Sequence, residues 1–224
     1  MGAFGGSMTF TTFHVRGEVE PGFRDRFLKS IQKEVFRPLT VEDELDETMG
    51  WVTIEHPFDV ELDYDKVFFN SYLNLALRID KWRIPTPLFK AWFADAERQH
   101  LAKVGKERLS KREKEDLKAV VTATLKRQLI PAMKVIDLSW NLDTGIVRFW
   151  NQSARIHEVL EDIFETTFGL TLIRDTPYVV ASHLGFDDAQ LDKLPELDPT
   201  PFHNKGLFLV MDDEPRATVT TEEA

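Results

Sequence analysis

The sequence predicts an α+β protein: a mostly antiparallel sheet with helices on one face, plus a central helical hairpin. Three observations lead to this fold class. Residues 66–82 have the alternating polarity of a long strand. Residues 86–131 contain two successive helix signals separated by a short connection. Residues 132–173 follow the order strand, strand, helix, strand, which is typical of α+β domains.

The first part of the chain predicts a strand, a helix and a second strand. Residues 8–19 are rich in β-branched and aromatic side chains, which favours a strand. After a Pro-Gly pair at 21–22, apolar residues recur at helical spacing and predict a short amphipathic helix that Pro38 ends. These apolar residues are Phe23, Phe27, Ile31 and Val35. Residues 50–54 are a further strand candidate.

The strand expected over 66–82 has two different faces. Its apolar residues mostly alternate: Val67, Phe69, Tyr72, Leu73, Leu75, Leu77 and Ile79. Asn74, Arg78 and Asp80 fall on the opposite parity. We therefore expect one face of this strand to be buried and the other to contact solvent.

Two helices are expected next, over residues 86–131. Thr86 followed by Pro87 is a favourable helix start, with Thr86 as the N-cap, and Gly105 is a favourable end. Ser110 and Glu113 have the spacing of a capping box, so a second helix starts there and Pro131 closes it. The short connection predicts a helical hairpin or a bent pair of helices.

The remaining elements complete the sheet. Residues 132–140 and 145–150 predict two strands that flank the turn 141–145. Ser153 is the expected N-cap of a helix that Gly169 ends, and 170–173 is a short strand.

The chain divides by composition near residue 175. We expect an α+β domain over 8–175, with the hairpin at 86–131 inside it. Residues 176–224 are acidic and proline-rich and predict an irregular tail, in which the apolar run 206–211 is a candidate edge strand.

Charge is distributed unevenly along the 224 residues, whose formal net charge is −10. Residues 1–80 and 135–224 are acidic, with net charges of −7 and −11, whereas residues 81–134 have a net charge of +8. An acidic total argues against nucleic acid as a partner, but a basic central segment permits local contact with phosphates.

Several function classes lack their sequence signals. With no cysteine, the chain cannot form a disulfide scaffold, a thiolate zinc site or a catalytic thiol. There is no Gly-x-Ser-x-Gly motif, no glycine-rich phosphate loop, no paired-histidine metal motif and no apolar stretch long enough to span a bilayer. We expect a cytoplasmic protein that is not an enzyme, with no catalytic residue, metal or cofactor.

An alternating acidic run is the one candidate metal site. On a strand, Asp59, Glu61, Asp63 and Asp65 would share a face and could ligate Mg²⁺ or Ca²⁺, which would make a metal-dependent enzyme. The other interpretation is a solvated, extended segment without a metal, which like charges in a row also favour.

The basic segment supplies the candidate DNA-binding residues. They are Lys103, Lys106, Arg108, Lys111, Arg112, Lys114 and Lys118, and Lys126 and Arg127 extend the set. One interpretation is a track of cations that contacts phosphates without reading sequence. The other is an ordinary solvated helix face, since Glu107, Glu113, Glu115 and Asp116 are interspersed.

The succession of motifs resembles the recombination-associated protein RdgC family of bacteria, over roughly residues 8–175. The motifs are Met49-Gly-Trp-Val-Thr53, the long strand before a proline-started helix, the segment Leu109–Lys118 leading to Leu129-Ile-Pro131, Ile136-Asp-Leu, Asp143-Thr-Gly145 with Ile146-Val-Arg, and the helix from Ala154.

The resemblance implies a homo-oligomer, a ring-shaped dimer in that family, which binds double-stranded DNA with little sequence preference and restrains RecA-driven strand exchange. It also implies a location at the bacterial nucleoid, and it places the basic hairpin where the family has basic residues. Because family members are usually longer, ring closure is not part of the expectation. The alternative is an RdgC-like structural or protein-interaction module that does not bind DNA.

Overall fold

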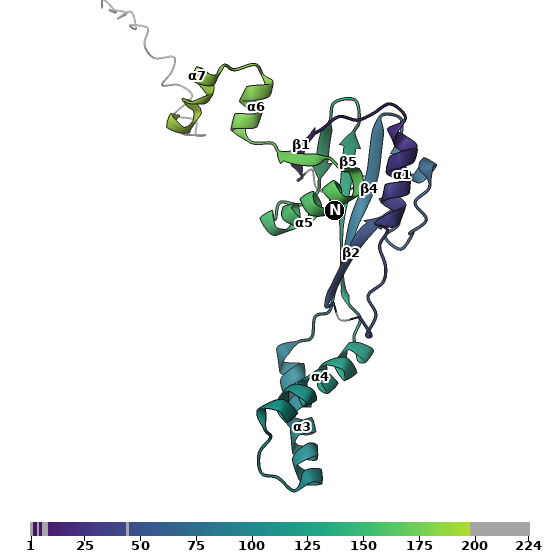
Figure 1. Ribbon diagram of the computed structural model, residues 1–224, viewed down its shortest axis with the longest axis vertical. Helices are drawn as coiled ribbons and strands as arrows, with labels where there is room; N and C mark the ends of the chain where they lie inside the picture. The colour runs from purple at the N-terminus through teal and green to yellow at the C-terminus, as the bar shows by residue number, and fades with distance from the viewer. Residues whose placement is uncertain (1, 4, 6–8, 44, 198–224) are drawn as a thin grey trace, which may run out of the picture. The chain divides into compact units, whose positions relative to one another are not determined.

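The computed structural model describes residues 2–3, 5, 9–43 and 45–197. In this part of the chain, seven strands form one antiparallel sheet in the order β2-β4-β5-β6-β1-β7, with β3 paired to β4. The strands are β1 (Thr11–Arg16), β2 (Glu47–Val52), β3 (Phe68–Phe69), β4 (Tyr72–Lys81), β5 (Ala132–Asn141), β6 (Ile146–Phe149) and β7 (Thr171–Arg174). Together with the helices, this sheet confirms the predicted α+β class (Figure 1).

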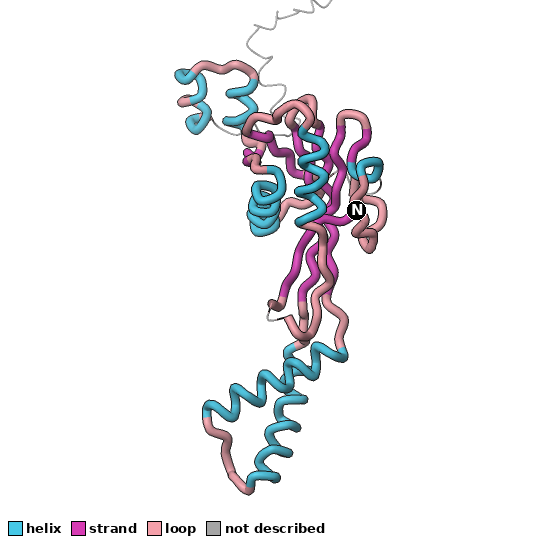
Figure 2. The backbone as a smooth tube through the Cα atoms, turned by 45° about the vertical axis from the view of Figure 1, so that its right-hand side comes forward, coloured by secondary structure: helices cyan, strands magenta, loops and turns pink. Residues whose placement is uncertain are grey.

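Two helices cover one face of the sheet, as predicted. They are α1 (Phe23–Lys33) and α5 (Ala154–Phe168), which contact each other and lie in front of the strands in Figure 2. Each has an apolar stripe that turns toward the sheet, because its large side chains recur three or four residues apart.

The hydrophobic core lies between these helices and the sheet. Trp51 of β2 and Trp140 of β5 are both buried there, with Phe27 of α1 and Phe168 of α5 against Trp140. The Trp51 indole N–H donates a hydrogen bond to the Thr167 hydroxyl at 2.9 Å, so this buried polar group is satisfied.

The helical hairpin is inserted between β4 and β5. These strands pair along their whole length, ending at Lys81 opposite Ala132, and the hairpin occupies the chain between these two residues. It consists of α3 (Thr86–Val104) and α4 (Lys111–Gln128), two helices that pack against each other (Figure 2). The helical pair expected over 86–131 is thus confirmed.

Three helix ends agree with the sequence signals. Gly105 ends α3 and Gly169 ends α5, each with the positive φ that glycine adopts without strain. Ser110 and Glu113 form both hydrogen bonds of the capping box that starts α4. Thr86 differs: it is the first residue of α3 rather than its N-cap, which is Pro85, and its side chain makes no capping hydrogen bond.

The single strand expected over 66–82 was wrong at its start. Residues 64–67 form the one-turn helix α2 (Tyr64–Val67), in which the Val67 N–H donates to the Asp63 carbonyl. The chain then reverses between β3 and β4 at Asn70, whose positive φ is typical of a tight turn. The alternating polarity of residues 66–71 therefore does not indicate one continuous strand, because a helical turn and a tight turn interrupt it.

The face of the sheet opposite α1 and α5 is also less exposed than expected. On β4, Ala76 and Asp80 are buried, and Arg78 forms a two-fold hydrogen-bonded ion pair with Asp80. The Arg78 guanidinium also stacks over the Phe36 ring, 4.0 Å from its centroid. Loop residues therefore cover this part of the face, which strand parity alone does not predict.

The chain divides into two units after Asp175. In the second unit, residues 176–197 are helical rather than irregular: they form α6 (Pro177–His183), α7 (Asp188–Leu191) and a 3₁₀ turn (Leu194–Glu196). Thr176 and Asp187 cap the two helices with their side chains, which explains why these polar segments fold locally. The candidate edge strand 206–211 lies outside the described residues.

No helix in the described part of the chain is long and apolar enough to cross a membrane.

Candidate nucleic-acid interface

All seven predicted DNA-binding residues lie on the hairpin, and all are exposed. Lys103 is in the last turn of α3, and Lys106 and Arg108 are in the connection. Lys111, Arg112, Lys114 and Lys118 are on α4. The hairpin therefore brings together the cations that the sequence places within sixteen residues.

The start of α4 is held by Glu113, and this neutralises one of the seven cations. One carboxylate oxygen of Glu113 accepts the Ser110 N–H at 2.8 Å, and the other accepts the Lys106 ammonium, also at 2.8 Å. These bonds, led by the one from Lys106, lower the pKa of Glu113 from 4.5 to about 2. Lys106 is thus committed to the capping structure.

The other six cations have no carboxylate partner. Among the described residues, ion pairs within 4 Å are formed by other side chains but not by Lys103, Arg108, Lys111, Arg112, Lys114 or Lys118. Glu115 lies four residues after Lys111 on α4, but no ion pair joins these two residues.

Three lysines share one side of α4. Lys111, Lys114 and Lys118 are three and four residues apart, so successive turns place them along a line. The Lys114 ammonium also lies 5.9 Å from the centroid of the Phe93 ring on α3, a cation–π distance. Arg112, one position from Lys111, points to a different side of the helix.

Lys126 does not belong to the cluster. It is buried, and its ammonium binds the Asp46 carboxylate at 2.7 Å and lies over the Trp82 ring. Lys126 therefore links the end of α4 to the segment before β2, and the extension of the basic set by Lys126 is wrong. Arg127 is exposed, as expected.

The hairpin buries its apolar side chains only in part. Val121 and Leu125 of α4 are buried, whereas α3 has no buried residue. Trp92 remains 38% exposed and Val120 61% exposed. This incomplete burial leaves apolar surface beside the cations.

Three exposed cations outside the predicted set lie at the base of the hairpin. Arg83 follows β4, Lys134 is on β5 and Arg155 is on α5. Two of them belong to the basic segment 81–134, so the charge distribution contained the signal. Arg155 is separated from that segment in the chain, and only the fold brings it near.

The acidic run does not form a shared face. Residues 59–63 lie in a loop rather than a strand, so alternation there does not align the carboxylates. Asp59 pairs with the Lys66 ammonium at 2.8 Å. Within the residues described, no group of three histidine or acidic side chains is placed to hold a metal ion.

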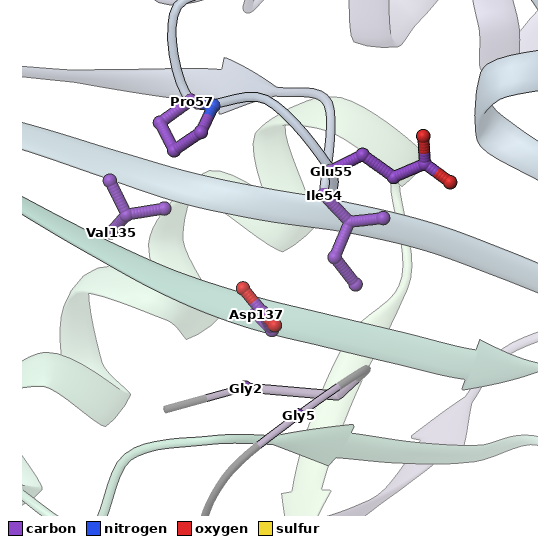
Figure 3. A pocket seen from close by; sticks show the side chains of 7 residues that line it. All are labelled: Gly2, Gly5, Ile54, Glu55, Pro57, Val135 and Asp137. Carbon is purple, nitrogen blue, oxygen red and sulfur yellow. The ribbon is translucent and has the colours of Figure 1, made fainter.

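A pocket of about 490 Å³ lies on the sheet face opposite α1 and α5 (Figure 3). The Asp137 carboxylate points into it and accepts the Ala3 N–H at 2.7 Å, and burial raises its pKa. The pocket has a second carboxylate in its lining, that of Glu55. These two carboxylates are the titratable groups among the described residues that line the pocket, and no serine, threonine, cysteine, lysine or histidine is among those lining residues.

No family model and no curated protein matches this sequence. The hairpin with its six unpaired cations therefore stands as the candidate interface on its own geometry.

Proposed function

We propose that this protein binds double-stranded DNA without sequence preference, by contacts from the hairpin to phosphates, and that it acts in recombination as the RdgC resemblance implies. The observation that carries the proposal is the set of six exposed hairpin cations that have no carboxylate partner among the described residues. Phosphate backbones repeat regularly, so flexible lysine side chains contact them in any register.

The electrostatic argument depends on the missing ion pairs. A lysine or arginine that is already paired with a carboxylate contributes little net binding free energy to a phosphate contact, because its existing ion pair must first be broken. Lys111, Lys114 and Lys118 make no such bond and release condensed counterions when they reach DNA. The acidic total charge does not oppose this, since charges more than about 10 Å apart are largely screened at 0.1 M salt.

The test compares two triple variants of equal charge. Lys111→Gln, Lys114→Gln and Lys118→Gln remove the lysine line, and Arg16→Gln, Lys29→Gln and Lys33→Gln remove three exposed cations elsewhere. Binding to two duplexes of unrelated sequence is measured by fluorescence anisotropy over a range of salt. We expect the hairpin variant to reduce the log–log salt slope by up to about three and the matched variant to leave it unchanged. Equal slopes in all three proteins would remove the hairpin from the interface.

A second function is supported by the exposed apolar surface of the hairpin. Trp92, Val104 and Val120 are each at least 38% exposed, and such side chains are typical of protein–protein contacts. They fit a homo-oligomer that binds DNA, and they also fit an RdgC-like interaction module that does not.

Solution mass with and without duplex, together with a gel shift at low salt, separates these functions. DNA binding predicts a shifted band for the full chain and for residues 1–175. An oligomeric mass with no shift in either protein would support the interaction module instead.

A further inference from the structure

A second cationic surface lies where the strands β4 and β5 extend past the helix layer. It is a groove of about 580 Å³ on the core side of the sheet, and α5 forms one wall. Ile79 and Ala132 form part of its floor, while Ile156 and Val159 line the α5 side. The groove is therefore built by three neighbouring strands, β2, β4 and β5, by the segment that follows β4, and by α5.

The charges in this groove are mostly positive and mostly unpaired. Glu47 is its one acidic lining residue among those described, and it pairs with Lys81. Arg83, Lys134 and Arg155 are exposed and form no ion pair with any described residue. Three cations, from the segment after β4, from β5 and from α5, thus line one concave surface without compensation.

The position of the groove relates it to the hairpin. Arg83 stands between the end of β4 and the start of α3, and Lys134 follows the end of α4 by six residues. The groove thus adjoins both points where the hairpin joins the sheet. A ligand with regularly spaced charges fits such a series better than a single small anion does.

We propose that this groove is a second contact for the phosphate backbone of DNA, made by Arg83, Lys134 and Arg155. The inference rests on the proposed function and deepens it, because it extends the interface from the hairpin onto the sheet. The shared chemistry is a phosphate group. Duplex DNA is the favoured source because the cations are exposed along an open groove and do not converge on one buried point.

The main experiment uses the full chain with Arg83→Gln, Lys134→Gln and Arg155→Gln. Duplex affinity is measured over a range of salt, beside the wild type, the hairpin triple variant and the matched variant Arg16→Gln, Lys29→Gln and Lys33→Gln. We expect the groove variant to reduce the salt slope by up to about three while the matched variant does not. Far-ultraviolet circular dichroism and the unfolding midpoint confirm that each variant is folded.

The outcomes separate the inference from the function on which it rests. If the salt slope of duplex binding is reduced in the hairpin variant but not in the groove variant, DNA binding stands and the groove contact is overturned. If the salt slope is reduced in the groove variant but not in the hairpin variant, the groove contact stands and the hairpin is not part of the DNA interface. If the wild type does not bind duplex at low salt, both are overturned.

A second arm tests a small phosphate ligand. Inorganic pyrophosphate is titrated into the wild type and the groove variant by calorimetry without DNA. Absence of a saturable heat supports the duplex contact. A saturable heat that the groove variant loses, with duplex affinity unchanged, would reassign the groove to a small phosphate compound and overturn the proposal.

Discussion

At the scale of single residues, Glu113 controls both the start of α4 and the charge of the hairpin. Its two carboxylate oxygens bind the Ser110 N–H and the Lys106 ammonium. The spacing of Ser110 and Glu113 predicts the capping box. No periodicity relates Lys106 to Glu113 across the connection, so the neutralisation of Lys106 could not be read from the sequence.

The lowered pKa of Glu113 predicts that acid weakens the hydrogen bonds at the start of α4. The ionised form is stabilised in the folded state, so its contribution is complete above the ordinary pKa of 4.5 and is lost as the pH falls through about 2. We expect Glu113→Gln to flatten this part of the stability profile, measured as the unfolding midpoint at a series of pH values. Parallel profiles for wild type and variant would contradict the assignment.

Arg78 and Asp80 form a second residue-scale feature, in which two charges are nearly buried. Their side chains are 11% and 7% exposed, and Asp80 accepts hydrogen bonds from the Arg78 guanidinium at 2.9 and 2.6 Å. The alternation of polar and apolar residues along the strand predicted that both side chains face solvent. It could not show that the rings of Phe36 and Phe58, distant in the chain, lie against the Arg78 guanidinium.

Removing one partner of this pair is expected to be costly. Asp80→Ala leaves a nearly buried guanidinium without its anion and should lower the free energy of unfolding by about 3–5 kcal/mol. The double variant Arg78→Met, Asp80→Leu should cost much less than the two single changes added together. Urea unfolding of the wild type, the single variants Arg78→Met and Asp80→Leu, and the double variant gives the coupling energy, and strict additivity would show that the pair is not coupled.

At the scale of elements, the sequence was most informative where a local signal determines the structure. The capping residue of α4 and the glycines that end α3 and α5 are such signals. It was least informative at residues 64–71, where a one-turn helix and a tight turn at Asn70 interrupt an apolar pattern. The seven candidate cations lie on the hairpin. Their ion pairs and the groove depend on contacts between segments that are distant in the chain, which the sequence does not show.

The strand β2 illustrates one such contact. The segment before it pairs with Trp51, through hydrogen bonds from the Phe36 N–H to the Trp51 carbonyl and from the Trp51 N–H to the Glu34 carbonyl, each at 2.9 Å. Gly50 lies directly under this crossing. Its lack of a side chain is what lets the two backbones approach.

Gly50→Ala should therefore destabilise the sheet edge. An added Cβ would overlap the backbone of Phe36 and lie 2.8 Å from the Val35 carbonyl carbon, neither of which is the flexible end of a side chain. We expect a loss of about 1–3 kcal/mol in chemical unfolding. Met49→Ala on the same strand, where the side chain is 40% exposed, is the control and should cost less. A Gly50→Ala variant as stable as the wild type would contradict this packing.

At the scale of the whole molecule, the two units differ in how they are built. Residues 1–175 contain the sheet and the principal hydrophobic core, and every proposed DNA contact lies within them. Removing 176–224 takes away acidic residues and no predicted phosphate contact. The first unit thus contains the sheet, its core and all the proposed phosphate contacts.

A protein ending at residue 175 should unfold cooperatively at nearly the same denaturant concentration as the full chain. It should also bind duplex with the same salt slope, because the same cations are present. Circular dichroism and fluorescence anisotropy measure the two properties. A protein 1–175 that is unfolded, or that binds with a changed slope, would show that the second unit takes part.

The insertion of the hairpin between paired strands has a consequence for engineering. Because Lys81 and Ala132 lie opposite each other, a two-residue turn can join β4 to β5 directly and replace everything between them. The cationic element is then a cassette, removable from the scaffold or transferable to another antiparallel ladder. The proposed phosphate contacts of the hairpin can then be changed without redesign of the core that supports it.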